Sequence, residues 1–318
     1  MLSPWLDNLI WDAAVLLAAV LLDLLLPEPP NALHPVVWIG KVTGALRRVA
    51  PQQPVAAFAF GCMMVAAVVG GAGAAAWFGL AALAAIHPIA YLIAGAVVLR
   101  TAFAVTGLTA AVHRTRRALA EGRLDAARES LRSLVSRNAA ALAPPLVAAA
   151  AIESVAENTS DSFVGPWLAF AVFGVPGAIA YRALNTMDSM VGYRGTTEYL
   201  GKAAARLDDL TNLIPARLSA LLLLASGRLA RHPVGRAWRT MRRDGGTTAS
   251  PNAGLTMSAM AGLLGVCLEK PGHYRLGEGF RDPEATDIGR AVTIVNRTAA
   301  LAVVVSLGVL AARHAITG

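Results

Sequence analysis

Three carboxylates stand at regular spacing in the stretch ESVAENTSDS of an otherwise largely apolar chain. Glu153, Glu157 and Asp161 are four residues apart, so on an α-helix they share one face. A charged side chain at the centre of a bilayer costs about 3 kcal/mol. The three acids should therefore face water, a cation or a basic partner. We interpret them, together with Asn158, as a cation or substrate site; a solvated surface helix is the alternative.

Further polar residues gather in four other stretches. Asp208 and Asp209, with Asn212 one turn later, supply the oxygen ligands that suit Mg²⁺, and a helix-capping acid pair is the alternative. His34 precedes a proline and is either a substrate ligand or a structural loop histidine. The remaining candidates for substrate or phosphate binding and for catalysis are Asn185, Asp188, Arg194, Arg243, Ser250 and Asn252.

The stretch RDGGTTASPNAG, residues 243–254, is rich in glycine and small polar residues and precedes an apolar segment. A loop of this kind before a helix can bind phosphate through backbone N–H groups and the helix N-terminus. It is not a Walker sequence, because it lacks Gly-Lys-Ser/Thr. An ordinary turn that caps a helix is the alternative interpretation.

The residue inventory limits the chemistry. The sequence has no Gly-x-Ser-x-Gly elbow, no paired Cys and His for nucleophilic catalysis, and no zinc-spaced His/Cys cluster. Acids, amides, glycine loops and arginines remain. These residue types favour Mg²⁺-assisted work on phosphates and carboxylates, in which positioning and charge neutralisation supply the catalysis. They predict an integral membrane enzyme or transporter with an oxygen-rich, cation-binding site.

The elements that must position these residues are expected to be membrane helices. Hydrophobic residues make up 56% of the 318 and charged residues only 15%, against about 25% in soluble domains. Mean hydropathy is +0.54. We therefore predict an all-α, polytopic membrane helix bundle that forms one integral membrane domain over residues 1–318.

Apolar length sets the expected spans, because a spanning helix needs about 20 residues. Residues 55–80 and 81–107 qualify clearly and should form a hairpin. Residues 9–26 are marginal, and 163–181 qualify despite two prolines, as does a C-terminal segment beginning near residue 292. Residues 213–226 and 257–268 are too short to span alone, so we expect buried or re-entrant pieces.

The formal net charge of +8 is concentrated in loops, which indicates orientation rather than binding of nucleic acid. The basic stretch from His113 to Arg137 should be cytoplasmic and helical, with a break at Gly122. We interpret it as a solvated helical hairpin, and direct binding of an anionic ligand is the alternative. Only Cys62 and Cys267 are present, so a disulfide framework is not expected.

Several blocks, taken together and in order, resemble the CbiB/CobD family of cobalamin biosynthesis. They extend from His34 to about residue 280. The blocks are HPVVWIGK, ESVAENTSDSFVGP, YRALNTMDSMVGY, YLGKAAARLDDLTNLIPARL and SPNAG followed by MAGLLGV.

The resemblance implies a multi-pass inner-membrane enzyme, adenosylcobinamide-phosphate synthase, with its active site facing the cytoplasm. Its reaction would join aminopropanol, or the O-phosphate of aminopropanol, to the free carboxylate of adenosylcobyric acid. The resemblance implies ATP as co-substrate and Mg²⁺ as cofactor. The implied partners are a corrinoid substrate and the lipid bilayer, and other membrane-bound late enzymes of cobalamin biosynthesis are possible further partners. By motif, Glu153, Glu157, Asp161 and Asp188 become catalytic candidates, and Asp208 and Asp209 candidates for the metal.

The chain departs from the family pattern in two places. It reads LLPEPP where Gly-Asp-Pro is expected before His34, and SRNAA, with Asn138, where Gly-Arg-Asp-Thr is expected. The second departure puts a metal role for Asn138 in doubt. Two alternatives to an enzyme stay open: a signalling relative of the same superfamily, and a corrinoid transporter, which would need matched halves that the sequence does not display.

A single site fed by cytoplasmic ATP also constrains topology. If residues 139–152 crossed the membrane alone, the acids at 153–161 and those at 185–212 would lie on opposite sides. Residues 139–161 and 163–181 should therefore both cross or both remain in one half of the bilayer. The prolines at 144, 145, 166 and 176 favour broken or tilted segments that line a cavity.

Overall fold

The computed structural model describes residues 8–135, 138–193, 195 and 197–317. The chain divides into two compact units. The first comprises residues 1–104, 165–211 and 304–318, and the second comprises residues 105–164 and 212–303. The expectation of one integral membrane domain over residues 1–318 stays a prediction.

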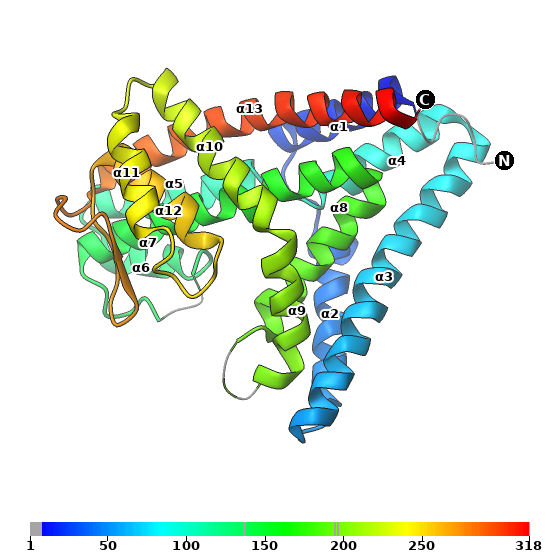
Figure 1. The fold of residues 1–318 in the computed structure, drawn as a ribbon, viewed down its shortest axis with the longest axis horizontal. Coiled ribbons are helices and arrows are strands. Elements are labelled where there is room, and N and C mark those ends of the chain that lie inside the picture. Colours follow the sequence, from blue (N-terminus) through cyan, green and yellow to red (C-terminus); the bar gives the residue numbers. More distant parts are fainter. Residues whose placement is uncertain (1–7, 136–137, 194, 196, 318) are drawn as a thin grey trace. The chain divides into compact units, whose positions relative to one another are not determined.

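In the first unit, all the regular secondary structure of the described residues is helical. Its long helix α3 packs against α4, α8 and α9, and α2 packs against α8 (Figure 1). The elements are α1 (Leu9–Leu25), a 3₁₀ turn (Asn31–Leu33), α2 (Pro35–Arg48), α3 (Pro54–Ile86), α4 (Pro88–Arg100), α8 (Gly165–Val191), α9 (Glu198–Thr211) and the C-terminal part of α13 (Ala285–Thr317).

Two glycines let three helices of this unit approach closely. A Cβ at Gly61 on α3 would overlap the carbonyl oxygen of Leu200 on α9. One at Gly201 on α9 would overlap the carbonyl of Val191, which ends α8. Small residues at such contacts allow backbones to pack together in apolar helices. The packing fixes α9 against α8, the two helices that carry most of the polar candidates of this unit.

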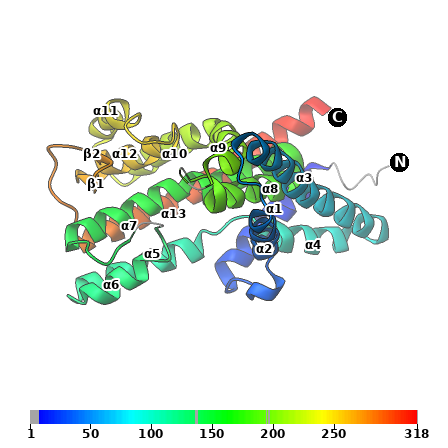
Figure 2. The same cartoon turned by 90° about the horizontal axis from the view of Figure 1, so that it is seen from below.

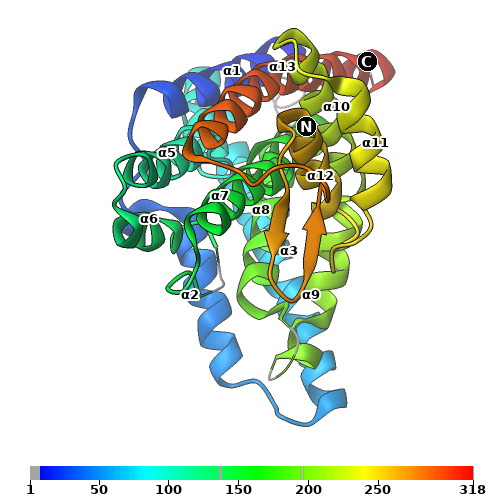
Figure 3. The same cartoon turned by 90° about the vertical axis from the view of Figure 1, so that its left-hand side faces the viewer.

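The second unit combines short helices with one β-hairpin. Strands β1 (Leu268–Lys270) and β2 (Tyr274–Leu276) are antiparallel, with Leu268 paired to Leu276 (Figure 3). The helical elements are α5 (Thr106–Ala120), α6 (Leu124–Leu131), α7 (Pro144–Thr159), a π-helical turn (Ser160–Val164), α10 (Leu213–Leu229), α11 (Val234–Asp244), α12 (Ala253–Leu264) and the N-terminal part of α13.

The predicted basic helical hairpin is confirmed. Helices α5 and α6 pack against each other and against α7 (Figure 2). Gly122 lies between them with φ of 72°, the left-handed region that glycine enters without steric cost. The expected break at Gly122 is therefore where the chain turns.

Three helical stretches are long and apolar enough to cross a membrane: Pro54–Ile86, Pro144–Val191 and Ala285–Ile316. Helices α9 and α10 pass the same test only as a pair bent by 46°, a broken span or a re-entrant loop. Helix α12 is a shorter apolar helix. The all-α membrane fold class is confirmed, as is the inference that residues 213–226 and 257–268 are too short to span alone.

The predicted second span, residues 81–107, is wrong. Helix α3 continues to Ile86, and α4 covers only 13 residues, too few to cross alone. The cause is Pro88, which cannot donate a backbone hydrogen bond and is tolerated at the start of a helix. His87 is extended, with φ of −163°, and its Nδ1 accepts a hydrogen bond from the Ile89 N–H.

The run Pro144–Val191 is broken, as its prolines predicted. The π-helical turn Ser160–Val164 follows α7 directly. Inside α8, Gly174 is non-helical, with φ of 67° and ψ of −168°, two residues before Pro176. Proline in a helix interior removes a hydrogen bond and clashes with the preceding turn, so the break lies where the sequence requires one.

A buried ionic cluster joins four helices of the first unit. Asp12 on α1 is 1% exposed and pairs with Arg313 on α13. Its other contacts are the Tyr91 hydroxyl from α4, at 3.1 Å, and His314 Nε2, at 3.1 Å. Arg313 Nη1 also donates to the Ala171 carbonyl on α8, at 3.1 Å. One carboxylate thus organises α1, α4, α8 and α13.

Asp12→Asn should lower the melting temperature of the detergent-solubilised protein by about 5 °C or more, because removing one member of a buried ion pair costs about 3–5 kcal/mol. Asp125→Asn is the matched control, since the Asp125 side chain is 96% exposed in its pair with Arg128. Equal melting temperatures for wild type and Asp12→Asn would show that the cluster does not hold these helices.

Candidate functional site

A polar cleft of about 210 Å³ opens in the first unit. Its charged lining comes from the last turn of α1 and the connection after it, from the end of α4 and from the middle of α8. Such a volume lies below the ~300 Å³ of most ligand pockets, so it suits one polar group rather than a whole large substrate. The ionisable side chains that line it are Asp23, Glu28, His34, Arg100 and Arg182.

Backbone geometry places two of these side chains. His34 is the residue before α2, and Pro35 occupies the first position of that helix, where proline is favoured. Arg100 is the last residue of α4, and its Nη2 donates to the carbonyls of Leu26 at 2.6 Å and Pro27 at 2.5 Å. These bonds tie the connection after α1 to the end of α4.

Behind the cleft, a chain of hydrogen bonds leads from α8 to α9. Arg182 Nη1 donates to Asn185 Oδ1 at 3.0 Å, and Asn185 Nδ2 donates to Asp208 Oδ1 at 3.5 Å. Asn185 and Asp208 are both 8% exposed. Nearby on the same helices, Asp188 and Asp209 are close enough for their charges to interact.

The surroundings of His34 favour the neutral form of its imidazole. Burial lowers the pKa of His34 most, Glu28 opposes that shift, and Arg182 and Arg100 lower the pKa further. Its buried Nδ1 has no hydrogen-bond partner among the residues that the structure describes. A neutral imidazole beside two guanidinium groups can accept a proton while the guanidinium groups bind an anion.

The structure thus brings together five of the sequence-predicted residues, drawn from α2, α8 and α9. They are His34, which directly precedes α2, Asn185 and Asp188 on α8, and Asp208 and Asp209 on α9.

The predicted magnesium ligands Asp208 and Asp209 lie in sequence at the end of α9. Among the described residues, no group of three or more His, Cys, Asp or Glu side chains gathers as a metal site. Mg²⁺ often uses only one or two protein carboxylates and completes its shell with water and substrate phosphate. Like-charged Asp188 and Asp209 side by side are compatible with that donor set, and the metal assignment stays a prediction.

The acid series lies in the second unit. Glu153 and Glu157 are on α7 and share a face, with Glu153 5% exposed and Glu157 half-buried. Asp161 falls in the π-helical turn, so the regular four-residue spacing no longer applies to it. Asn158 is bonded within the helix, with Nδ2 donating to the Ser154 carbonyl at 2.9 Å.

Two further contacts place residues near this turn. Ser162 Oγ donates to Asn158 Oδ1 at 2.8 Å. Asn212, which precedes α10, accepts a long hydrogen bond of 3.5 Å from Ser160 on its Oδ1. The side chains that accompany the acids are therefore engaged in positioning the π-helical turn.

The glycine loop of residues 245–252 is anchored by a residue that the sequence interpretation missed. The carboxylate of Asp244, at the end of α11, accepts a hydrogen bond from Arg243 Nε at 2.6 Å and another from the Gly277 N–H at 2.7 Å. Within the loop, the Asn252 N–H donates to Ser250 Oγ at 3.3 Å. Arg243 is thus paired with Asp244, and phosphate binding by the loop stays a prediction.

Not every functional candidate was visible in the sequence interpretation. Arg100 and Arg182 line the cleft but were not singled out. Each follows an apolar stretch, and an arginine at such a position signals a functional or paired group. Arg194, by contrast, lies outside the described residues.

The fold and the cleft define a helical membrane protein with a site of arginines, histidine and carboxylates. The model of the CobD/Cbib protein family matches residues 16–304, and the chain belongs to that family. This confirms the family resemblance inferred from the sequence blocks.

Relatives match over most of their length. The chain is 44% identical over 297 residues to the cobalamin biosynthesis protein CobD of Dehalococcoides mccartyi, covering 93% of this chain and 96% of the relative. It is 43% identical over 260 residues to the cobalamin biosynthesis protein CobD of Geobacter metallireducens, covering 80% of each. The probable cobalamin biosynthesis protein CobD of Methanothrix thermoacetophila is 37% identical over 309 residues, with 93% and 96% covered. No solved structure matches the chain significantly.

Gly254→Ala should destabilise the glycine loop, because a Cβ there would overlap the Gly245 carbonyl oxygen, whereas a Cβ at Gly246 would meet open space. We expect Gly254→Ala to lower the melting temperature and increase proteolysis within residues 245–252. Gly246→Ala is the matched control and should behave as wild type. Equal stability of the two variants would contradict the loop geometry.

Asp244 should stabilise the second unit only while it is ionised. Burial favours its neutral form, but the hydrogen bonds from Arg243 and the Gly277 N–H outweigh burial and lower the pKa of Asp244. Its contribution should be complete above the unfolded pKa of about 3.9 and be lost as pH falls through the lower folded value. Melting temperatures of wild type and Asp244→Asn should differ at pH 7, and the difference should shrink progressively as pH falls below about 3.9. A difference independent of pH would contradict this.

Proposed function

We propose that this chain acts in cobalamin biosynthesis as an ATP-dependent ligase of the bilayer. It would join aminopropanol, or its O-phosphate, to the free carboxylate of adenosylcobyric acid, giving adenosylcobinamide or its phosphate. Family membership and the names of the relatives support the pathway. The single observation that supports the chemistry is the cleft in which Arg100, Arg182 and His34 meet.

The proposed reaction has two steps. A carboxylate oxygen attacks the γ-phosphorus of ATP, ADP leaves, and an acyl phosphate forms. The amine nitrogen then attacks the acyl carbon, phosphate leaves, and the amine loses a proton. Activation is needed because an unactivated carboxylate does not readily form an amide in water.

The cleft residues match the needs of these steps. Arg100 and Arg182 can bind the anionic oxygens of the carboxylate or acyl phosphate in their planar forks. His34, held neutral, can accept the proton that the amine loses. Asn185 orients Arg182 through the 3.0 Å hydrogen bond and so positions the guanidinium group.

The acidic candidates are proposed as ligands of cations. Asp208 and Asp209 would hold Mg²⁺, which would neutralise phosphate charge when bound, with Asp188 close to Asp209. Glu153, Glu157 and Asp161 remain a proposed cation or substrate site on α7 and in the π-helical turn. Arg243, Ser250 and Asn252 remain the proposed phosphate ligands of the glycine loop.

Incubation of the purified protein with adenosylcobyric acid, ATP, Mg²⁺ and aminopropanol phosphate should yield the corrinoid amide, identified by mass. A parallel reaction with unphosphorylated aminopropanol establishes which amine is accepted. No amide product from either amine, with a folded protein and both substrates intact, would favour the signalling or transporter alternative.

Arg182→Gln should reduce turnover by about 100-fold or more, because one charged group that stabilises the reacting oxygens is lost. Arg132→Gln is the control, since Arg132 is an exposed arginine that follows α6 and pairs with Glu129. Membrane insertion should be retained in both variants. Turnover should be compared below the melting temperature of each, because Arg182 also bonds to Asn185. Near-native turnover of Arg182→Gln would remove the cleft from the mechanism.

A further inference from the structure

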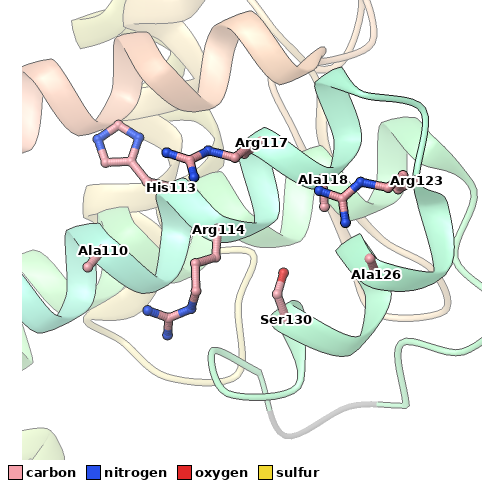
Figure 4. A pocket seen from close by; sticks show the side chains of 8 residues that line it. All are labelled: Ala110, His113, Arg114, Arg117, Ala118, Arg123, Ala126 and Ser130. Carbon is pink, nitrogen blue, oxygen red and sulfur yellow. The ribbon is translucent and has the colours of Figure 1, made fainter.

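A second cleft, of about 470 Å³, lies between α5 and α6 within the second unit (Figure 4). Its lining carries four basic side chains and one hydroxyl, and no acidic residue is among them. The polar residues that line it are His113, Arg114, Arg117, Arg123 and Ser130, and alanines complete the wall.

The walls are held in place by contacts of the helical hairpin itself. Thr115 Oγ1 on α5 and Ser130 Oγ on α6 are 2.7 Å apart, with Thr115 fully buried. Past the Gly122 turn, the Arg123 N–H donates to the Ala118 carbonyl at 2.9 Å. Ala118 and Ala126 line the cleft, and their small side chains leave its volume open.

The positive charge of this cleft is poorly compensated. Among the residues that the structure describes, neither Arg114 nor Arg117 makes an ion pair, whereas Arg123 pairs with Glu121. Burial, followed by repulsion from Arg116 and Arg117, lowers the pKa of His113. In Figure 4, Arg117 extends beside His113, Arg123 points back towards Ala118, and Arg114 extends from the opposite side of α5.

We propose that this cleft binds a phosphate-bearing anion. Arg117 lies close enough to His113 to lower the pKa of that imidazole. A phosphate would compensate the unpaired guanidinium groups with charge-assisted hydrogen bonds. Arg114 and Arg117 flank the cleft from one helix, while Arg123 and Ser130 supply donors from the turn and the second helix. The phosphate belongs either to a small soluble molecule or to an anionic lipid headgroup, which present the same chemistry.

The proposal does not depend on ligase activity, because its test measures binding alone. The double variant Arg114→Gln/Arg117→Gln removes the two unpaired charges. Arg132→Gln/Arg239→Gln removes the same number of charges from exposed positions, at the end of α6 and on α11, that do not line the cleft. Circular dichroism and melting temperature establish that both double variants fold.

Two binding arms distinguish the sources. In the first, calorimetry measures inorganic phosphate and pyrophosphate binding to the full chain in neutral detergent. In the second, native mass spectrometry measures retention of phosphatidylglycerol by protein from nanodiscs that contain phosphatidylcholine with or without it. We expect the cleft variant to lose at least tenfold in phosphate affinity or in lipid retention. The control variant should bind as the wild type does in both arms.

Loss in the phosphate arm assigns the cleft to a soluble phosphate, and loss in the lipid arm alone assigns it to a headgroup. Unchanged binding in both arms, or equal losses in the cleft and control variants, would overturn the proposal. Arg117→Gln alone should give an intermediate loss in the responding arm. Wild-type binding by this single variant, with the double variant unfolded, would also overturn it.

Discussion

Buried charge in an apolar chain must find a partner, and this constraint determines much of the structure. Several acids with almost no solvent exposure are held by an arginine or an amide, which comes from another element, a preceding loop or the adjacent residue. Burying an unpaired carboxylate would cost more than most packing contacts return. The pairs are Asp12 with Arg313, Asp208 with Asn185, Asp244 with Arg243, and Asp287 with Arg281.

The candidate site follows from the same constraint. Arg182 lies on a helix of a candidate span and bonds to Asn185, which in turn bonds to Asp208. These bonds hold Arg182 in place, and its guanidinium group lines a cleft with Arg100 and His34. Residues that stabilise the helix packing thus also prepare a place for an anion. Close packing at Gly201 brings α9 near enough to α8 for the long Asn185–Asp208 bond.

Local signals allowed much of the fold to be predicted from the sequence. Composition predicts membrane helices, Gly122 marks the turn of the basic hairpin, and Pro176 predicts the break in α8. Each depends on chemistry within a few residues. The second span failed because hydropathy alone does not locate a helix end, whereas Pro88 and the extended His87 do.

Contacts distant in sequence could not be predicted in the same way. Asp12 and Arg313 are separated by 301 positions, and no local pattern pairs them. The clustering of His34 with residues of α8 and α9 depends on helix packing that apolar periodicity does not specify. Asp244 stands in the glycine-rich stretch 243–254 without a pattern that marks it, and only the bond from the Gly277 N–H identifies it as an anchor.

The central claim is that the chain activates a carboxylate with ATP before it forms the amide. Adenosylcobyric acid labelled with ¹⁸O in its free carboxylate tests this claim directly. The account predicts that one ¹⁸O appears in inorganic phosphate, or in AMP if the intermediate is an acyl adenylate, for each amide formed. Amide product with no ¹⁸O in either phosphate species would contradict it.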